Sequence, residues 1–271
     1  MRRALVLALL LAGALANAGR TADAPTRTIA MPGKLYAPAM IDVLVGTTVT
    51  WKNDDAINHT ATADEDAFAS GYIPPGGSFS FSFTKEGRYV FHCSIHKFMR
   101  GEVNVFGLVL SGPEAPVISG QRVVFAGLAP PGTTEVVLRG LGPGVTLRPR
   151  PDGSFAARLA VARPTVFRAV AGTLSSPRVR VVVRPRVSLS LAGGVADVAA
   201  TPARPGASAV LQRYDRERFD WVAVARAKLD ARSRARFTIS GDAQRIRVLV
   251  RGSSGWADAA SLPALLGASA S

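Results

Sequence analysis

Cysteine and histidine are scarce in this 271-residue chain, which has one cysteine, Cys93, and three histidines. A single cysteine excludes an internal disulfide, so packing alone must hold the fold together. Acidic side chains are also few, with 19 Asp and Glu against 33 Lys and Arg. After residue 18 no apolar run reaches the roughly 20 residues that a membrane span needs. We therefore expect no transmembrane segment after residue 18.

Helical periodicity is weak along the whole sequence, and two common catalytic patterns are missing. There is no Gly-rich phosphate loop and no Ser-His-Asp arrangement with a plausible partner. Short runs instead alternate apolar and polar residues between Gly, Pro and Ser, which is typical of half-buried strands. The sequence therefore predicts an all-β protein.

The first residues have the pattern of a secretory signal peptide. A charged start at Arg2 and Arg3 precedes an apolar run over 4–15 and the small residues Ala16-Asn17-Ala18. We expect cleavage before Gly19 and a periplasmic or extracellular location. An uncleaved anchor is the alternative. An unpaired thiol would be open to oxidation in an oxidising compartment. Metal ligation would protect the thiol of Cys93, so the single cysteine favours a metal site.

Metal-binding side chains recur at a spacing of three in the run Phe91-His92-Cys93-Ser94-Ile95-His96-Lys97-Phe98-Met99. With His59 upstream, they supply two imidazoles, one thiolate and one weak thioether, the ligand set of a blue copper site. A tight loop between two strands can bring three of these groups together, with His59 arriving from a neighbouring strand. His92 adjoins Cys93 on a strand, so its side chain should point to the opposite face.

Around these residues the sequence resembles the cupredoxins over about 27–106, and the ligand loop is most similar to the short loop of the amicyanin and plastocyanin branch. The stretches that carry the resemblance are Tyr36-Ala37-Pro38, Val45 to Asp54, His59 to Thr62, Pro75 to Phe79, Gly87-Arg88-Tyr89 and Gly101-Glu102-Val103. The resemblance implies one type 1 copper ion, with His59, Cys93 and His96 as equatorial ligands and Met99 as the axial one.

The resemblance also implies supporting and docking residues. Asn53 and Ser94 match positions that orient the ligands from behind. Ile95, Lys97 and Phe98 surround His96 and would form the docking patch for a redox partner. Where the amicyanin-like loop usually has prolines beside the second histidine, this chain has Ile95 and Lys97, so the loop loses the stiffness that proline gives.

Each of these residues has a simpler interpretation when taken alone. A lone cysteine is usually a small buried hydrophobe, and a lone methionine usually fills a gap in a core. Zinc is the main alternative metal because cysteine and histidine also bind it. Zinc sites seldom recruit methionine, so the spacing and the full ligand set favour copper.

The histidine count separates a carrier from an enzyme. Multicopper oxidases and copper nitrite reductases need further histidines for a second copper centre, and this chain has three in all. We expect an exported one-electron carrier and no substrate-converting site. Two alternatives stay open: a protein that stores, senses or delivers copper, and a surface-attached protein whose C-terminal modules carry the main function.

The remaining length predicts two further modules. Alternating runs continue after Gly107, and the turn at Pro131-Gly132 recurs at Pro205-Gly206, an offset of about 75 residues that suits one small β-sandwich. We expect a cupredoxin Greek-key β-sandwich followed by two Ig-like or fibronectin-like modules, with one double-sized sandwich as the alternative. The predicted segments are a signal peptide (1–18), a cupredoxin domain (19–110), two modules (111–184 and 185–264) and a disordered tail (265–271).

Charge is divided unevenly between these parts. Residues 19–106 have 8 Lys and Arg against 9 Asp and Glu, whereas residues 107–271 have 23 against 10. The basic half could be drawn to an anionic surface of the cell envelope or to an acidic partner. Nucleic acid is a poor candidate because the arginines alternate along strands. In the N-terminal part, Asp54, Asp55 and the acidic run 64–66 are interpreted as a solvated loop face.

Overall fold

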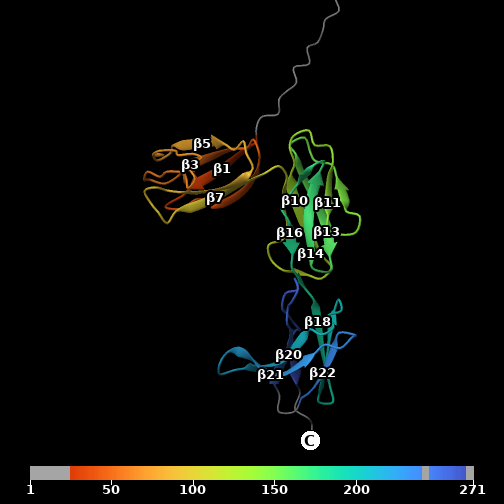
Figure 1. The fold of residues 1–271 in the computed structure, drawn as a ribbon. Coiled ribbons are helices and arrows are strands. Elements are labelled where there is room, and N and C mark those ends of the chain that lie inside the picture. Colours follow the sequence, from red (N-terminus) through yellow and green to blue (C-terminus); the bar gives the residue numbers. More distant parts are fainter. Residues whose placement is uncertain (1–24, 240–243, 267–271) are drawn as a thin grey trace, which may run out of the picture.

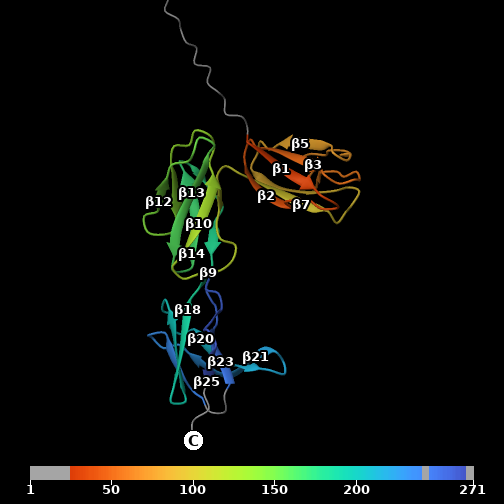
Figure 2. The same cartoon turned by 180° about the vertical axis from the view of Figure 1, so that it is seen from behind.

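The computed structural model describes residues 25–239 and 244–266, and all of its regular elements are strands. The all-β prediction is confirmed. The predicted signal peptide at 1–18 lies outside the described residues, as does most of the predicted tail. Figures 1 and 2 show three separate β-sandwiches that follow one another in chain order. Within the described residues no helix occurs that could cross a membrane.

The N-terminal sandwich consists of two sheets that enclose one apolar core. One sheet has the order β1-β3-β5 and the other β2-β7-β6-β4, with β1 parallel to β3 and β2 parallel to β7. The bounds are β1 (Thr26–Met31), β2 (Met40–Leu44), β3 (Thr48–Asn53), β4 (Thr62–Ala63), β5 (Ser78–Ser82), β6 (Gly87–His92) and β7 (Arg100–Phe106).

Alternation along these strands builds the core of the N-terminal sandwich. In β3, Val49 and Trp51 are fully buried, whereas Thr50 between them is half-buried and Lys52 is exposed. The Trp51 indole lies 4.9 Å from the Phe68 ring and 5.3 Å from the Phe91 ring, as centroid distances. Cys93 and Met99 belong to the same buried cluster. The loop that contains Cys93 and Met99 is therefore anchored in the core of this domain.

The second sandwich encloses a separate core between the sheet β13-β10-β8 and a sheet of β12, β11, β14, β15 and β16. A short parallel pair, β9 and β17, lies at its edge. The bounds are β8 (Val109–Ser111), β9 (Val117–Ile118), β10 (Gln121–Leu128), β11 (Val136–Arg139), β12 (Val145–Leu147), β13 (Ser154–Val161), β14 (Thr165–Ala171), β15 (Leu174–Ser175), β16 (Val179–Val181) and β17 (Val183–Arg184).

The third sandwich packs the sheet β18-β19-β22 against a sheet of β21, β20, β23, β24 and β25. The bounds are β18 (Arg186–Ala192), β19 (Val195–Thr201), β20 (Ser208–Asp215), β21 (Asp220–Lys228), β22 (Arg234–Thr238), β23 (Gln244–Val250), β24 (Ala259–Ala260) and β25 (Ala264–Leu266).

The second and third sandwiches repeat one strand order. In the second, β10 pairs with β8 and β13, and β11 pairs with β12 and β14. In the third, β19 pairs with β18 and β22, and β20 pairs with β21 and β23. The two repeated turn glycines, Gly132 and Gly206, have φ of 84° and 77°, a region that glycine adopts without a steric cost. Two sandwiches are therefore present instead of one of double size.

Two of the predicted segment ends are corrected by the structure. The expected start of the second module at 111 falls within β8, because the buried residues Leu108 and Leu110 already belong to the second core. The predicted disordered tail starts too early, since Leu265 and Leu266 pair with β23. The last two modules also contact each other, because Trp256, which follows β23 of the third sandwich, packs against the second core.

Candidate metal centre

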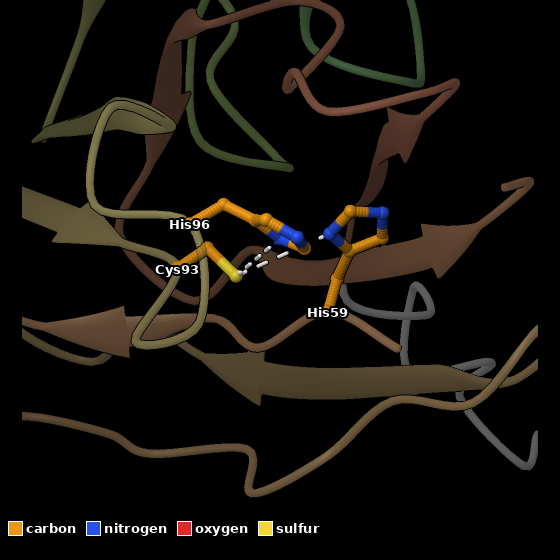
Figure 3. Close-up of side chains that lie close together, drawn as sticks. All are labelled: His59, Cys93 and His96. Atoms are coloured by element: carbon orange, nitrogen blue, oxygen red, sulfur yellow. Dashed lines mark hydrogen bonds between the residues drawn. The ribbon is translucent and has the colours of Figure 1, made fainter. Parts of the chain in front are cut away.

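Three of the predicted ligands, His59, Cys93 and His96, point toward one another in the N-terminal sandwich (Figure 3). The ligand atoms of His59, Cys93 and His96 all lie within 4.8 Å of one another. Cys93 Sγ is 3.6 Å from His96 Nδ1 and 4.0 Å from His59 Nδ1. Among the residues that the structure describes, this is the one such group of three or more histidine, cysteine or acidic side chains.

The loop between β6 and β7 is closed by two backbone hydrogen bonds that involve Met99. The Cys93 N–H donates to the Met99 carbonyl at 3.2 Å, and the Met99 N–H donates to the His96 carbonyl at 2.8 Å. Met99 is 2% exposed and packs in the same cluster as Cys93. This tight turn brings both ends of the Cys-x2-His-x2-Met run to the same side of the domain.

His59 enters the site from the opposite loop and is fixed from behind. Its ring is fully buried, and its Nε2 lies 2.9 Å from Asp55 Oδ2. Because Nε2 is used by this carboxylate, Nδ1 is the nitrogen that faces Cys93. The hydrogen bond to His59, followed by one from the Ala56 N–H, lowers the pKa of Asp55 below its usual range. From the sequence Asp55 was expected in a solvated loop face, and its contact with His59 was not predicted.

Asn53 and Ser94, the two predicted supporting residues, hold different loops of the site. The buried Asn53 amide donates to the carbonyls of Ile57 and Ile73 at 2.8 Å each, and its Oδ1 accepts from the Asp55 N–H at 3.0 Å. Asn53 therefore holds the loop that carries Asp55 and His59. Ser94 contributes its backbone N–H, which donates to Thr60 Oγ1, and its hydroxyl lies 3.2 Å from Thr62 Oγ1.

Thr60 joins the two loops of the site, and sequence analysis did not single it out. Its Oγ1 accepts from the Ser94 N–H at 2.8 Å, and its own N–H points to Cys93 Sγ at 3.4 Å. Its carbonyl accepts from the buried Tyr36 hydroxyl at 2.6 Å. The only sequence signal for this role was its position beside His59.

The local field favours a thiolate at Cys93. Burial of this thiol works to raise its pKa, but hydrogen bonds from the backbone N–H groups of His96 and Thr60 and from the His59 ring outweigh burial and lower it to about 6. A thiolate is the form that binds a metal. Burial and the nearby Cys93 charge raise the pKa of Tyr36, so its hydroxyl stays a donor.

His92 lies outside the group, as predicted from its position next to Cys93. Its Nδ1 is 2.6 Å from Asp64 Oδ1, and Arg100 contacts the other oxygen of that carboxylate at 3.2 Å. Asp64 is thus a second residue of the acidic stretch that pairs with a histidine. The hydrogen bond to His92 lowers the pKa of Asp64.

The donor set and its surroundings fit a single copper ion. Two imidazole nitrogens and a thiolate converge, and a buried thioether follows in the same loop, which is the ligand chemistry of blue copper sites. Zinc would accept the first three groups but gains little from methionine. The exposed side of the group is formed by Ile95, 44% exposed, and Phe98, 71% exposed, with the half-buried His96 between them.

Comparison with known proteins gives the family. The family model of the cupredoxin-like domain matches residues 4–105. Plastocyanin of Scenedesmus fuscus is 31% identical over 84 residues, and the match covers 26% of this chain and 86% of that protein. This chain belongs to the cupredoxin family. Amicyanin of Paracoccus denitrificans is 36% identical over 75 residues, which are 26% of this chain and 57% of amicyanin.

One solved structure extends this comparison. The purple cupredoxin of Nitrosopumilus maritimus is 32% identical, with a TM-score of 0.28, and the match covers 29% of this chain and 97% of that one. The chain spans a little over half the length of the amicyanins that it matches. The family model covers residues 4–105, the N-terminal part of the chain, so the Ig-like resemblance of the C-terminal sandwiches stays a prediction.

Proposed function

We propose that this chain is an exported type 1 copper protein that carries single electrons between partner proteins. The observation that carries the proposal is the convergence of His59, Cys93 and His96 within 4.8 Å, next to the buried Met99. Copper bound there would supply a centre that alternates between two oxidation states. The relatives named amicyanin and plastocyanin support this function.

The residues of the site have separate tasks in this proposal. Cys93 and His96 hold the metal from the β6–β7 loop, and His59 and Met99 complete the set. The fixed orientation of His59, held through Asp55 and Asn53, keeps the ligands in place when the charge of the site changes. Little rearrangement then accompanies each electron transfer.

A docking patch around His96 is part of the proposal. The exposed side chains of Ile95, Lys97 and Phe98 surround the half-buried ring, and the Phe98 ring is 6.2 Å from that of His96. Apolar contact there would bring a partner close to the ligand nearest the surface. Lys97 places a positive charge in the patch, which favours partners with an acidic contact surface.

A carrier role explains the histidine inventory better than an enzyme role. His92, the one histidine that is not in the group, is hydrogen bonded to Asp64. Among the described residues no second group of three or more histidine, cysteine or acidic side chains lies close enough together to hold another ion. We propose no substrate-converting site for this chain.

Copper titration of the purified full chain tests the proposal. One equivalent of Cu(II) should give an intense visible thiolate-to-copper absorption band, which one electron per protein should bleach and reoxidation should restore. Cys93→Ser should lose the band. Ser94→Ala, which keeps the backbone N–H bonded to Thr60, should retain it. Binding without this band, or rapid transfer of the metal to a chelator, would contradict an electron carrier.

A further inference from the structure

The sheet that contains β20, β21 and β23 in the third sandwich has a second face, which points away from the third core. In these strands Ala209, Leu211, Ile246 and Val248 are buried in the third core. Because side chains alternate along a strand, the intervening residues of β20 and β23 project to the other face. We call this face, with Gln212, Tyr214, Trp221, Arg226, Arg245 and Arg247, the outer face.

Aromatic rings and guanidinium groups alternate across the outer face. Trp221 is paired with Tyr214, and their ring centroids are 5.4 Å apart. The Arg247 guanidinium lies 4.3 Å from the Trp221 ring, and that of Arg245 lies 5.8 Å from the Tyr214 ring. Arg247 Nε also donates to Gln212 Oε1 at 2.8 Å. Arg247 is therefore held by two contacts before any ligand arrives, whereas Arg245 is exposed and lies over the Tyr214 ring.

Positive charge dominates this face. On β21 the exposed Arg226 and Lys228 are paired with Val210 and Ser208, which places them on the same side as Gln212. The acidic residues of these three strands, Asp215 and Asp220, are paired with each other at the hairpin end of the sheet. Four cations thus share one face, with the nearest acidic pair at its margin.

The opposite sheet of the same sandwich differs. There the exposed Arg236 is neutralised by Asp197 at 2.8 Å. Arg186 and Arg234 are also exposed on that sheet. In the part of the chain that the structure describes, the arginines that stack on aromatic rings do not include those of this sheet, so it provides a matched control for the effect of charge alone.

We propose that the outer face binds an anionic polysaccharide that carries carboxylate groups. Arg245 and Arg247 are two residues apart, about 7 Å along β23, and β21 lies two strands away, about 10 Å. This spacing suits charges repeated along a polymer better than one small anion. Arginine pairs bidentately with carboxylates, and half-buried Trp and Tyr rings offer flat amphipathic surfaces to sugar rings. The inference is independent of the metal site.

The occupant follows from charge complementarity across the C-terminal half. Residues 107–271 have 23 basic and 10 acidic side chains, whereas the cupredoxin domain is nearly balanced. A polyanion would bind through the C-terminal half and leave the docking patch around His96 free. The carrier would then be retained at an acidic polymer and still meet its redox partners.

The test uses the full chain and alginate, a polyuronate, as the probe. Binding by titration calorimetry at low salt should weaken at least about tenfold in Arg226→Glu/Arg245→Glu, a loss of about 1.4 kcal/mol. Arg186→Glu/Arg234→Glu makes the same change of charge on the opposite sheet and should weaken binding less than about twofold. Thermal unfolding of both variants checks that the third sandwich is intact. If the first variant is unfolded, Arg226→Gln/Arg245→Gln replaces it.

Three outcomes would overturn the inference. Equal losses in the two double variants would show that net charge alone attracts the polymer. Equal binding of a neutral glucan would show that the cations are irrelevant. Binding of phosphatidylglycerol vesicles without binding of alginate would assign the face to a lipid surface. The copper band is measured separately, so none of these outcomes bears on the proposed electron carrier.

Discussion

At the scale of single residues, the contact between Asp55 and His59 adds a property that the ligand set alone does not provide. The carboxylate fixes which nitrogen of the buried ring faces Cys93. A carboxylate behind a metal-bound histidine also makes the ring a stronger ligand. Asp55 is only 19% exposed in its side chain, so solvent weakens this effect only in part.

Replacing Asp55 should therefore weaken copper binding and raise the reduction potential. Removal of such a partner typically costs about 10- to 100-fold in metal affinity. We expect about tenfold for Asp55→Ala, and a smaller loss for Asp55→Asn, which keeps an acceptor oxygen. Competition with a chelator and cyclic voltammetry measure the two quantities.

Asp54→Asn is the matched control for Asp55. Asp54 is adjacent in sequence but pairs with Lys52 at 2.8 Å on the surface. Its replacement should leave copper affinity unchanged. If the two positions gave equal effects, the general charge of the loop, and not the contact with His59, would control the site.

Sequence reasoning pointed to the proposed ligand residues more readily than to the residues that support them. Thiolate, imidazole and thioether are chemically distinctive, so the spacing of Cys93, His96 and Met99 was informative. Asp55 looked like any surface acid, because its value depends on a loop conformation that Asn53 imposes. The hydroxyl of Thr60 was equally unremarkable, since its acceptor role arises only when two loops meet.

At the scale of elements, Thr60 connects the His59 loop to the β6–β7 loop. Thr60→Val keeps the shape of the side chain but leaves the Ser94 N–H without its acceptor. A lost partner of this kind costs about 1–3 kcal/mol. We expect the free energy of unfolding of the copper domain to fall by that amount. Urea titration, with loss of the visible absorption band as the signal of unfolding, measures it. Copper should also dissociate faster.

Thr60→Ser provides the control for this contact. It keeps the hydroxyl and removes only a methyl group, so most of the stability and the slow copper loss should return. If Thr60→Ser were as unstable as Thr60→Val, packing of the methyl group in the 3% exposed side chain would explain the effect instead of the hydrogen bond.

The pairing of β6 with β7 depends on a glycine beneath an aromatic ring. Gly101 is paired with Phe91, and a Cβ at position 101 would lie 2.3 Å from Phe91 Cζ. Gly101→Ala should therefore destabilise the copper domain by about 1–3 kcal/mol. Urea unfolding measures this change. The loss of unfolding free energy caused by Gly101→Ala should be at least about 0.5 kcal/mol smaller in a Phe91→Leu background than in the natural sequence. Strict additivity would refute the steric explanation.

The strands themselves were predictable, but their ends were not. Alternation of apolar and polar residues indicated strands in β16, β18 and β23, where one face is buried or half-buried. The start of β8 was misplaced because the apolar run from Leu108 to Leu110 is continuous and gives no sign of which core receives it. Tertiary packing decided that choice.

At the scale of the whole molecule, the three cores are distinct. The buried clusters of the three sandwiches share no residue. The contact between the first two leaves a cavity of about 300 Å³, lined by Val43 and Leu44 from one side and Leu128 and Pro151 from the other. By contrast, Trp256 reaches from the third sandwich into the second core. We therefore expect the copper domain to unfold separately from the coupled C-terminal pair.

Removal of copper should consequently affect one calorimetric transition only. A ligand present at 100 times its dissociation constant stabilises the native state by about 2.7 kcal/mol. For a domain of this size each kcal/mol shifts Tm by about 4–8 °C. In calorimetry of the full chain, the Tm of one transition should thus be at least about 10 °C lower in the copper-free protein. The Tm of every other transition should stay the same. Cys93→Ser, with copper added, should resemble the copper-free chain. If every transition moved together, the three sandwiches would form one cooperative unit, and the loosely filled contact at Val43 and Leu128 would have to transmit the stabilisation.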